Sequence, residues 1–263
     1  MDIEWVEIPA GEAIIGLNEK QKRSLIKRLH QQVGGLWQLF TSQRKRLKAA
    51  EWWISQIPDE QRVRLNKFFV SRYPVTLQQY VDYQRQVGHP ISTLSQRNLD
   101  YGWGKLPVFA DYENALAFCR HIQARLPTSL EWEKVARGPE GWLYPWGNKW
   151  DSRRANVVQR IAKELPKDRQ PPSSWASEVD AYPTGQSAYG VWDLVGNIQE
   201  WTSSTRNFAL PKGGNWQAHV VRRYPIRLCD DLAWIYNLLA MEIPNEDGRA
   251  HAEWYIGFRV VRD

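Results

Sequence analysis

The stretch Arg125-Leu-Pro-Thr-Ser-Leu-Glu-Trp-Glu-Lys-Val-Ala-Arg-Gly138 decides the fold of this chain. Thr128 is a favoured N-cap residue and Glu131 follows three residues later, so together they predict a capping box at the start of a helix. The block Tyr144-Pro-Trp-Gly-Asn148 lies a few residues beyond, within an irregular stretch, 138–215, that is rich in Gly, Pro, Trp and Asn. Such a long irregular stretch predicts support from buried aromatic side chains or bound ions.

The segment before this stretch predicts short strands and a helical insert. Residues 3–16 alternate in hydrophobicity and predict one or two strands. Residues 18–58 predict a helical hairpin, because apolar residues recur at spacings of three, four and seven on both sides of Gly34-Gly35, and Pro58 ends the second helix. The two apolar stripes consist of Leu25, Ile26, Leu29 and Val33, and of Leu36, Phe40, Leu47, Ala50 and Ile54.

Other elements follow from similar patterns. Thr76 caps one helix, and the apolar residues Ala115, Phe118 and Cys119 predict the inner face of another. The predicted elements are a strand over 63–75, helices over 77–86, 111–123 and 129–137, and strands over 222–228 and 255–261.

The composition indicates a soluble globular protein, with 43% hydrophobic and 24% charged residues among 263. The sequence contains no run of 18 apolar residues, so it predicts no membrane helix. The N-terminus lacks a basic region followed by an apolar core, so we expect no secretory signal and a cytoplasmic location. Two cysteines, Cys119 and Cys229, cannot form a disulfide framework, and both fit small buried residues.

The positive charge belongs to one segment. The net charge is +6, but residues 18–67 hold twelve Lys and Arg against four acids, a balance of +8. Arg44, Lys45, Arg46 and Lys48 stand close to Trp52-Trp53. This basic hairpin could meet nucleic acid, an anionic surface or an acidic partner protein, or it could simply be a solvated helix face.

Further motifs in the C-terminal half, taken with the two opening blocks, resemble the formylglycine-generating enzyme family, also called the sulfatase-modifying factor family. The additional strings are Ala155-Asn-Val157, Ala188-Tyr-Gly-Val-Trp-Asp-Leu-Val-Gly-Asn-Ile-Gln-Glu-Trp201, Lys212-Gly-Gly-Asn-Trp216 and Ile256-Gly-Phe-Arg-Val260. They occur in the family's order and cover residues 3–16 and 63–263. The resemblance implies one α+β domain over 1–263, with a C-type-lectin-like, loop-rich fold and residues 18–58 as an insert.

The resemblance also implies a calcium-binding site. In the family, the residue that matches Asp193, the carbonyl groups that match Gly196 and Ile198, and the carboxylate that matches Glu200 bind Ca²⁺, a cation that prefers oxygen ligands. The alternative is a capped turn whose polar groups bond the backbone. A second family site would use Asn156 and Val157, but the loop over 170–175 offers no Asp, so that site would need Asp168 or Asp180.

The residues required for the family's oxidation are replaced. The family places two cysteines after the GGSW-type motif, because thiolates bind copper(I) and capture a substrate thiol. Ala218 and Arg223 occupy these positions, and only His219 matches the motif's histidine. We therefore expect no copper and no formylglycine synthesis. The five histidines are scattered and predict no metal triad, and no GxSxG context supports a hydrolase.

Three functions remain open. A binding module would take a protein or small ligand at the C-terminal loops, where aromatic residues are frequent anchors. The candidate ligand-binding residues are Trp216, His219, Arg223, Trp234, Tyr236 and Trp254. An accessory subunit would instead bind an acidic protein or nucleic acid through the basic hairpin. A metal-dependent oxidase would need a non-standard site around His219 and Arg223.

Overall fold

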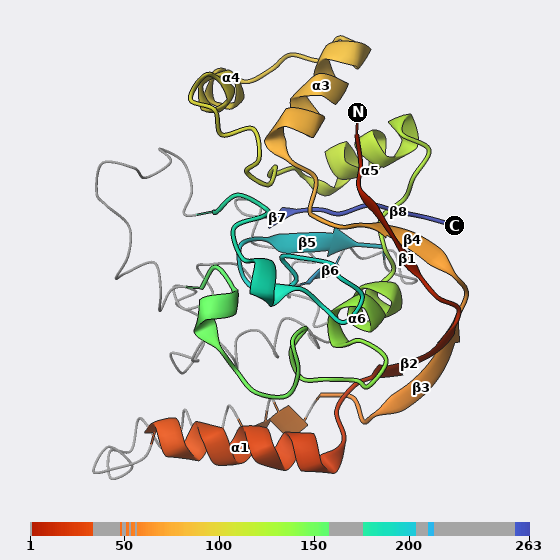
Figure 1. The fold of residues 1–263 in the computed structure, drawn as a ribbon, viewed down its shortest axis with the longest axis vertical. Helices are drawn as coiled ribbons and strands as arrows, with labels where there is room; N and C mark the ends of the chain where they lie inside the picture. Colours follow the sequence, from red (N-terminus) through yellow and green to blue (C-terminus); the bar gives the residue numbers. More distant parts are fainter. Residues whose placement is uncertain are drawn as a thin grey trace.

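The computed structural model describes residues 2–33, 48, 51–52, 54–55, 57–157, 176–203, 210–212 and 256–263. They form a mixed α+β fold with small sheets and short helices, which confirms the expected fold class. Figure 1 shows α3, α4 and α5 at one end, α1 at the other, and the strands and α6 between them. The elements are β1 (Trp5–Ile8), β2 (Gly11–Ile15), α1 (Glu19–Val33), β3 (Gln61–Leu65), β4 (Phe68–Ser71), α3 (Leu77–Val87), α4 (Thr93–Asp100), α5 (Tyr112–His121), α6 (Ser129–Arg137), β5 (Gln199–Thr202), β6 (Leu210–Lys212), β7 (Ile256–Gly257) and β8 (Val261–Arg262).

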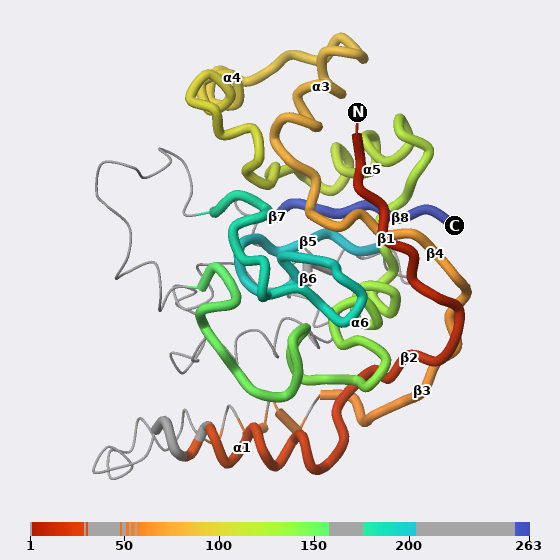
Figure 2. Tube along the Cα trace, in the orientation of Figure 1, coloured from red at the N-terminus to blue at the C-terminus, as the bar shows by residue number. Residues whose placement is uncertain are grey.

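A bent ribbon of paired strands forms one edge of the fold (Figure 2). β1 pairs with β4 and β2 pairs with β3, so residues 5–15 run antiparallel to residues 61–71. Sequence patterns predicted one strand over 63–75, but the ribbon bends and divides it into β3 and β4. Pro9 has no N–H to give to a ladder at the bend. The Lys134 ammonium stabilises the bend by donating to the Pro9 carbonyl at 2.7 Å.

The predicted strand over 255–261 is also divided. β7 pairs in parallel with β5, whereas β8 pairs antiparallel with β4 in a different sheet. Between them, the carbonyl groups of Phe258 and Val260 accept hydrogen bonds from the backbone N–H groups of Val75 and Ser71, at 2.8 and 2.9 Å. This segment therefore joins two sheets. A single apolar pattern could not show that its pairing partners change halfway.

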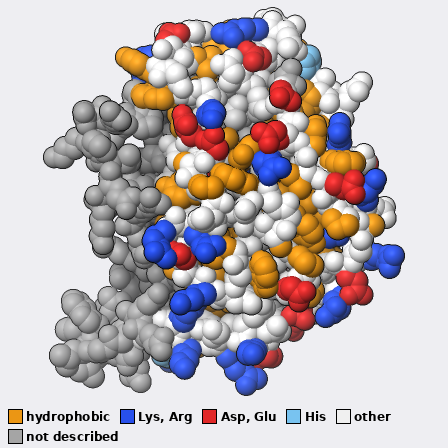
Figure 3. Space-filling model, viewed as in Figure 1, with side chains coloured by type: hydrophobic (Ala, Val, Ile, Leu, Met, Phe, Trp, Pro, Cys, Tyr) orange, Lys and Arg blue, Asp and Glu red, His pale blue; other side chains and the backbone are white. Residues whose placement is uncertain are grey.

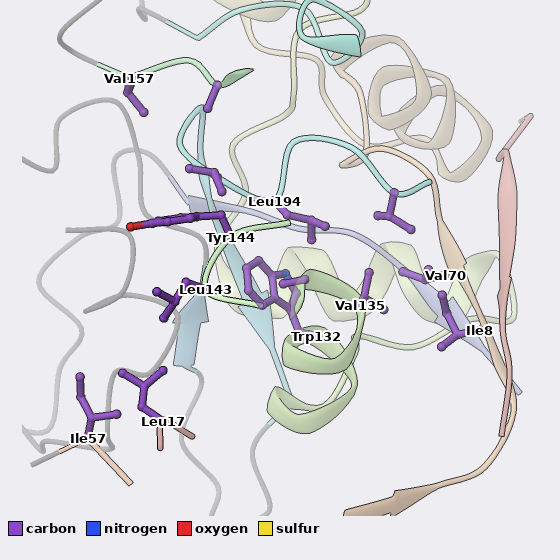
Figure 4. Packing of buried hydrophobic residues seen from close by; sticks show 14 of the residues in the cluster. Ile8, Leu17, Ile57, Val70, Trp132, Val135, Leu143, Tyr144, Val157 and Leu194 are labelled. Carbon is purple, nitrogen blue, oxygen red and sulfur yellow. The ribbon is translucent and has the colours of Figure 1, made fainter. Parts of the chain in front are cut away.

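Two hydrophobic clusters fill the interior. The first surrounds Trp132 of α6 and includes Ile8, Val135 and Leu194, as Figure 4 shows. The second contains Phe118, whose ring meets that of Phe258 edge to face at 5.3 Å. Cys119 lies in the second cluster and is 2% exposed, as predicted.

Capping residues begin the helices where the sequence predicted them. The Thr76 and Thr128 hydroxyl groups each accept a hydrogen bond from the backbone three residues on, and both helices carry complete capping boxes. α4 was not predicted, because its only buried residue is Asn98 and it therefore lacks an apolar stripe. No helix in the described part of the chain is long and apolar enough to span a membrane.

The insert packs against the fold. α1 matches the first predicted helix, and Leu25 on its inner face is fully buried. Lys48, Glu51, Trp52, Ile54 and Ser55 are helical, while the rest of the predicted second helix lies outside the described residues. Gly16 lies just before the insert and has a φ of 72°; an added Cβ there would lie 2.5 Å from the carbonyl oxygen of Asp59. Glycine therefore permits the two ends of the insert to approach closely.

Candidate functional site

Three of the sequence motifs meet at one buried carboxylate. Glu200 on β5 accepts a hydrogen bond from the Trp132 indole N–H at 2.7 Å. Arg259 donates to both of its oxygen atoms, with its Nε at 2.5 Å and its Nη2 at 2.6 Å. Glu200 and Arg259 are fully buried, so each charge is neutralised by the other in a region of low dielectric. This contact joins α6, β5 and the segment between β7 and β8.

A second buried ion pair on α6 supports the base of the insert. Arg137 is fully buried and lies 3.1 Å from Glu133, one helical turn before it. The Glu133 carboxylate accepts a hydrogen bond from the Gly16 N–H at 2.8 Å, and Arg137 donates to the Gly16 carbonyl. Arg137 also donates to the Gly141 carbonyl at 2.8 Å. These motif side chains therefore position backbone rather than face an open site.

Tyr144 connects the second opening block to the insert. It is fully buried, and its ring stacks on that of Trp146 at 5.8 Å and contacts that of Trp150 at 5.2 Å. Arg28 of α1 lies over the Tyr144 ring and donates a hydrogen bond to its hydroxyl. The family-type motif and the insert are thus packed against each other.

The buried side-chain amide of Asn197 forms hydrogen bonds that hold three loop segments together. Its Nδ2 donates to the Ser177 carbonyl at 3.1 Å and to the Asp193 carboxylate at 3.0 Å. Its Oδ1 accepts from the Asn156 side chain at 3.0 Å and from the Ser177 N–H at 2.9 Å. Gly196 makes this packing possible, because an added Cβ would lie 2.3 Å from the Asn156 carbonyl oxygen. The Asn197 amide therefore uses its full hydrogen-bonding capacity.

This arrangement brings together residues from both predicted calcium sites. Asn156 forms a parallel bridge with Gly196, and Val157 and Ile198 are buried beside them. The sequence placed Asn156 and Val157 in a second site, separate from Gly196 and Ile198. In the structure, the two sets share one loop cluster.

Asp193 is the acidic member of this cluster. Burial raises its pKa to about 8, although the Asn197 hydrogen bond and the charge of Arg259 act in the opposite direction. The backbone has a φ of 55°, a conformation that Asp and Asn tolerate better than most residues. A buried carboxyl group with a raised pKa is a group that a bound cation would stabilise in its charged form.

The donor set fits calcium in part. Asp193 and the nearby backbone carbonyl groups are oxygen ligands of the kind that Ca²⁺ prefers, and the buried Ser177 hydroxyl has no hydrogen-bond partner among the described residues. Glu200, however, already binds Arg259 and Trp132, so it would have to share its carboxylate with the ion. No group of three His, Cys, Asp or Glu residues suited to a metal occurs among the described residues.

The other predicted site residues fall mostly outside the described residues. This applies to every candidate ligand-binding residue in the C-terminal loops, to Ala218 and to Cys229. The ligand-binding candidates are Trp216, His219, Arg223, Trp234, Tyr236 and Trp254. Of the basic surface, Arg44, Lys45 and Arg46 also lie outside, whereas Lys48 is described and exposed.

Sequence reasoning missed the roles of Arg259, Trp132 and Asn197. One signal was present for Arg259, because a single charged residue between Phe258 and Val260 in an apolar segment implies a buried partner. The identity of that partner, Glu200, depends on the pairing of β5 with β7 and could not be read from spacing.

The chain is similar in sequence to several known proteins. A protein from Bos taurus named "Inactive C-alpha-formylglycine-generating enzyme 2" is 38% identical over 117 residues, which cover 41% of this chain and 38% of the relative. "Uncharacterized protein YfmG" from Bacillus subtilis is 27% identical over 221 residues, which cover 66% and 45%. The mouse formylglycine-generating enzyme is 34% identical over 99 residues, which cover 36% and 26%. The matches span less than half the length of these relatives.

Solved structures share the fold at low sequence identity. PvdO from Pseudomonas aeruginosa superposes with a TM-score of 0.57 and 15% identity, covering 99% of this chain and 94% of that chain. CarF has a TM-score of 0.57 and 18% identity, with coverage of 99% and 98%. Over residues 4–263 the sequence matches the family described as "Sulfatase-modifying factor enzyme 1-like domain". The chain therefore belongs to this family, to which the formylglycine-generating enzymes also belong.

Proposed function

We propose that this chain is a non-catalytic member of its family and works as a binding module. The observation that carries the proposal is the presence of Ala218 and Arg223 where the family's oxidation uses two cysteines. Neither side chain can form the thiolate that copper(I) binding requires. The similarity to relatives named inactive formylglycine-generating enzyme 2 supports the same conclusion.

The buried motif contacts support a scaffold role for the rest of the chain. Trp132, Glu200 and Arg259 bond to one another, and Glu133 and Arg137 bond to the base of the insert. None of these groups is left for substrate chemistry. We therefore assign ligand recognition to the surface loops that this scaffold carries. We place the binding of a protein or small ligand at the C-terminal loops, through Trp216, His219, Arg223, Trp234, Tyr236 and Trp254.

Calcium forms a second part of the proposal. Asp193 and the carbonyl groups of Gly196 and Ile198 would hold the ion, with Asn156 and Val157 in the adjacent loop. When bound, calcium would neutralise the buried Asp193 carboxylate and fix the loop that Asn197 organises. The unpartnered Ser177 hydroxyl supports this assignment, since buried polar groups normally have partners.

Metal analysis and an activity assay test the proposal together. We expect stoichiometric calcium, no copper or iron, and no conversion of a cysteine-containing peptide to an aldehyde in the presence of copper(I) and oxygen. Asp193→Asn should abolish the calcium without unfolding the protein, because Asn also tolerates this backbone conformation. Bound copper or iron would contradict the proposal, and aldehyde formation that His219→Ala abolishes would establish the non-standard oxidase.

The binding surface needs its own experiment. Replacing Trp234, Tyr236 and Trp254 by Ala should remove binding of a purified ligand, whereas Tyr101→Ala should leave it intact. Tyr101 is a suitable control because it is an exposed aromatic residue outside the C-terminal segment, with 62% of its area accessible. Equal loss in both variants would contradict recognition by the C-terminal loops.

A further inference from the structure

Trp52 is an exposed tryptophan in the insert. It is 54% exposed, whereas Ile54, two residues later, is 7% exposed and belongs to the first hydrophobic cluster. Lys48, four positions before Trp52, is also helical and exposed. An indole ring contributes most where it is buried, and tryptophan is enriched among the residues that dominate binding energy at interfaces.

α1 presents a stripe of cationic side chains. Lys20, Arg23 and Lys27 are exposed and recur at spacings of three and four residues, which puts them on one face of the helix. Leu25 faces the opposite way and is fully buried. The stripe is therefore held toward solvent by the packing of the helix against the core.

The cationic stripe of α1 and the exposed residues around Trp52 lie next to each other. His30, one turn after Lys27 on α1, contacts Glu51, and Glu51 immediately precedes Trp52. This contact crosses from α1 to the helix that bears Trp52. The outer face of the insert, defined as Lys20, Arg23, Lys27, Lys48 and Trp52, thus combines an aromatic anchor with cations.

Acids interrupt this positive surface. Glu19 lies 3.7 Å from Arg23, and Asp59 lies 2.7 Å from Lys22. On the neighbouring ribbon Glu12 lies 2.9 Å from Arg62. Figure 3 shows basic and acidic side chains interleaved along the lower edge, where α1 and the β2–β3 ribbon lie. The acidic side chains would repel a ligand with a uniform row of phosphates. A protein partner can instead place a basic side chain opposite each acidic one.

We propose that the outer face of the insert binds an acidic protein segment of mixed charge. Trp52 enters an apolar hollow of the partner, and carboxylates of the partner meet Lys20, Arg23 and Lys27. The binding would be salt-dependent, since its charged contacts stay close to solvent. This surface uses other residues than the C-terminal loops of the proposed function, so the two proposals are tested by different variants and can fail independently.

Fluorescence anisotropy of labelled probes tests the proposal. The main probe is a peptide of about 20 residues, about 30 Å long as a helix, with Glu on one face, Leu beside it and a Lys at each end. The comparison probes are a short DNA duplex and vesicles containing phosphatidylserine. We expect the peptide to bind more tightly than either, and Trp52→Ala to weaken its binding at least about tenfold, as for an interface hot spot.

Matched variants separate the surface from general charge and folding. Lys27→Glu should weaken peptide binding several-fold, while Arg120→Glu on α5, with the same change in net charge, should not. Tyr101→Ala controls for the loss of an exposed ring, and circular dichroism checks that each variant is folded. Tighter binding of DNA or vesicles than of the peptide, no peptide binding at millimolar concentration, or equal effects of Lys27→Glu and Arg120→Glu would each overturn the proposal. The calcium content should stay the same in all variants.

Discussion

Arg259 and Glu200 are two residues whose effects on stability depend on each other. Removing the guanidinium by Arg259→Leu leaves the buried Glu200 carboxyl group without its ion-pair partner, so we expect a loss of about 3–5 kcal/mol in the free energy of unfolding. The double variant Arg259→Leu, Glu200→Gln should recover part of this loss, because no unpaired charge remains. Urea unfolding of the two single variants and the double variant measures the coupling. A purely additive result would show that the pair is not coupled.

Glu131 links the start of α6 to Arg125, which donates to its two carboxylate oxygens at 2.8 and 2.7 Å. Burial would raise the pKa of Glu131, but hydrogen bonds from Arg125 and Thr128 outweigh it and lower the pKa below the ordinary 4.5. The stabilising effect of the ionised group is therefore complete above pH 4.5 and is lost as the pH falls through the lowered pKa.

The substitution Glu131→Gln tests this pH dependence. At pH 7 it should reduce the free energy of unfolding by up to about 1 kcal/mol, because the ion pair with Arg125 is lost while Gln can still complete the capping box, as Gln79 does on α3. The difference from the unaltered protein should shrink when urea unfolding is repeated at successively lower pH below 4.5, as Glu131 takes up its proton. A difference that stays constant with pH would show that the ionised form is not what stabilises the helix.

At the scale of elements, α1 is part of the core and not an appendage. Leu25 is fully buried in the same cluster as Trp132. We expect Leu25→Ala to lower the free energy of unfolding by about 2–5 kcal/mol, the range for removing a buried leucine side chain. Arg23→Ala, on the outer side of the same helix, should change it by less than about 0.5 kcal/mol. Denaturant unfolding compares the two, and equal small effects would mean that the insert unfolds separately.

At the scale of the whole molecule, the reactivity of the Cys119 thiol reports on unfolding of the protein. It is buried in the second hydrophobic cluster, and burial raises the pKa of its thiol to about 12. In a Cys229→Ser background, Cys119 should react with a thiol reagent only when the protein unfolds, because the reactive species is the exposed thiolate. The labelling rate should follow the unfolding equilibrium as urea is added. Rapid labelling without denaturant would indicate local opening around α5.

Much of the fold could be predicted because its signals are local. Thr76 and Thr128 specify helix starts through contacts three residues away, and the motif strings predicted the family. α4 escaped prediction because it has no apolar stripe. The role of Arg259 escaped because its partner is 59 positions away in the sequence. At the candidate site, the contacts around Asn197 depend on three loops meeting, and no pattern within any one of them encodes that meeting.

The segment from β7 to β8 has a consequence for how this protein is made. The backbone of Val260 bonds to the Ser71 side chain, 189 positions earlier. A ribosome adding about 5–20 residues per second would leave β4 without this neighbour for about 10–40 s. During that time Phe68 and Val70, both buried in the finished protein, lack their final cover. Newly made chains should therefore depend on chaperones more than complete chains that refold from urea.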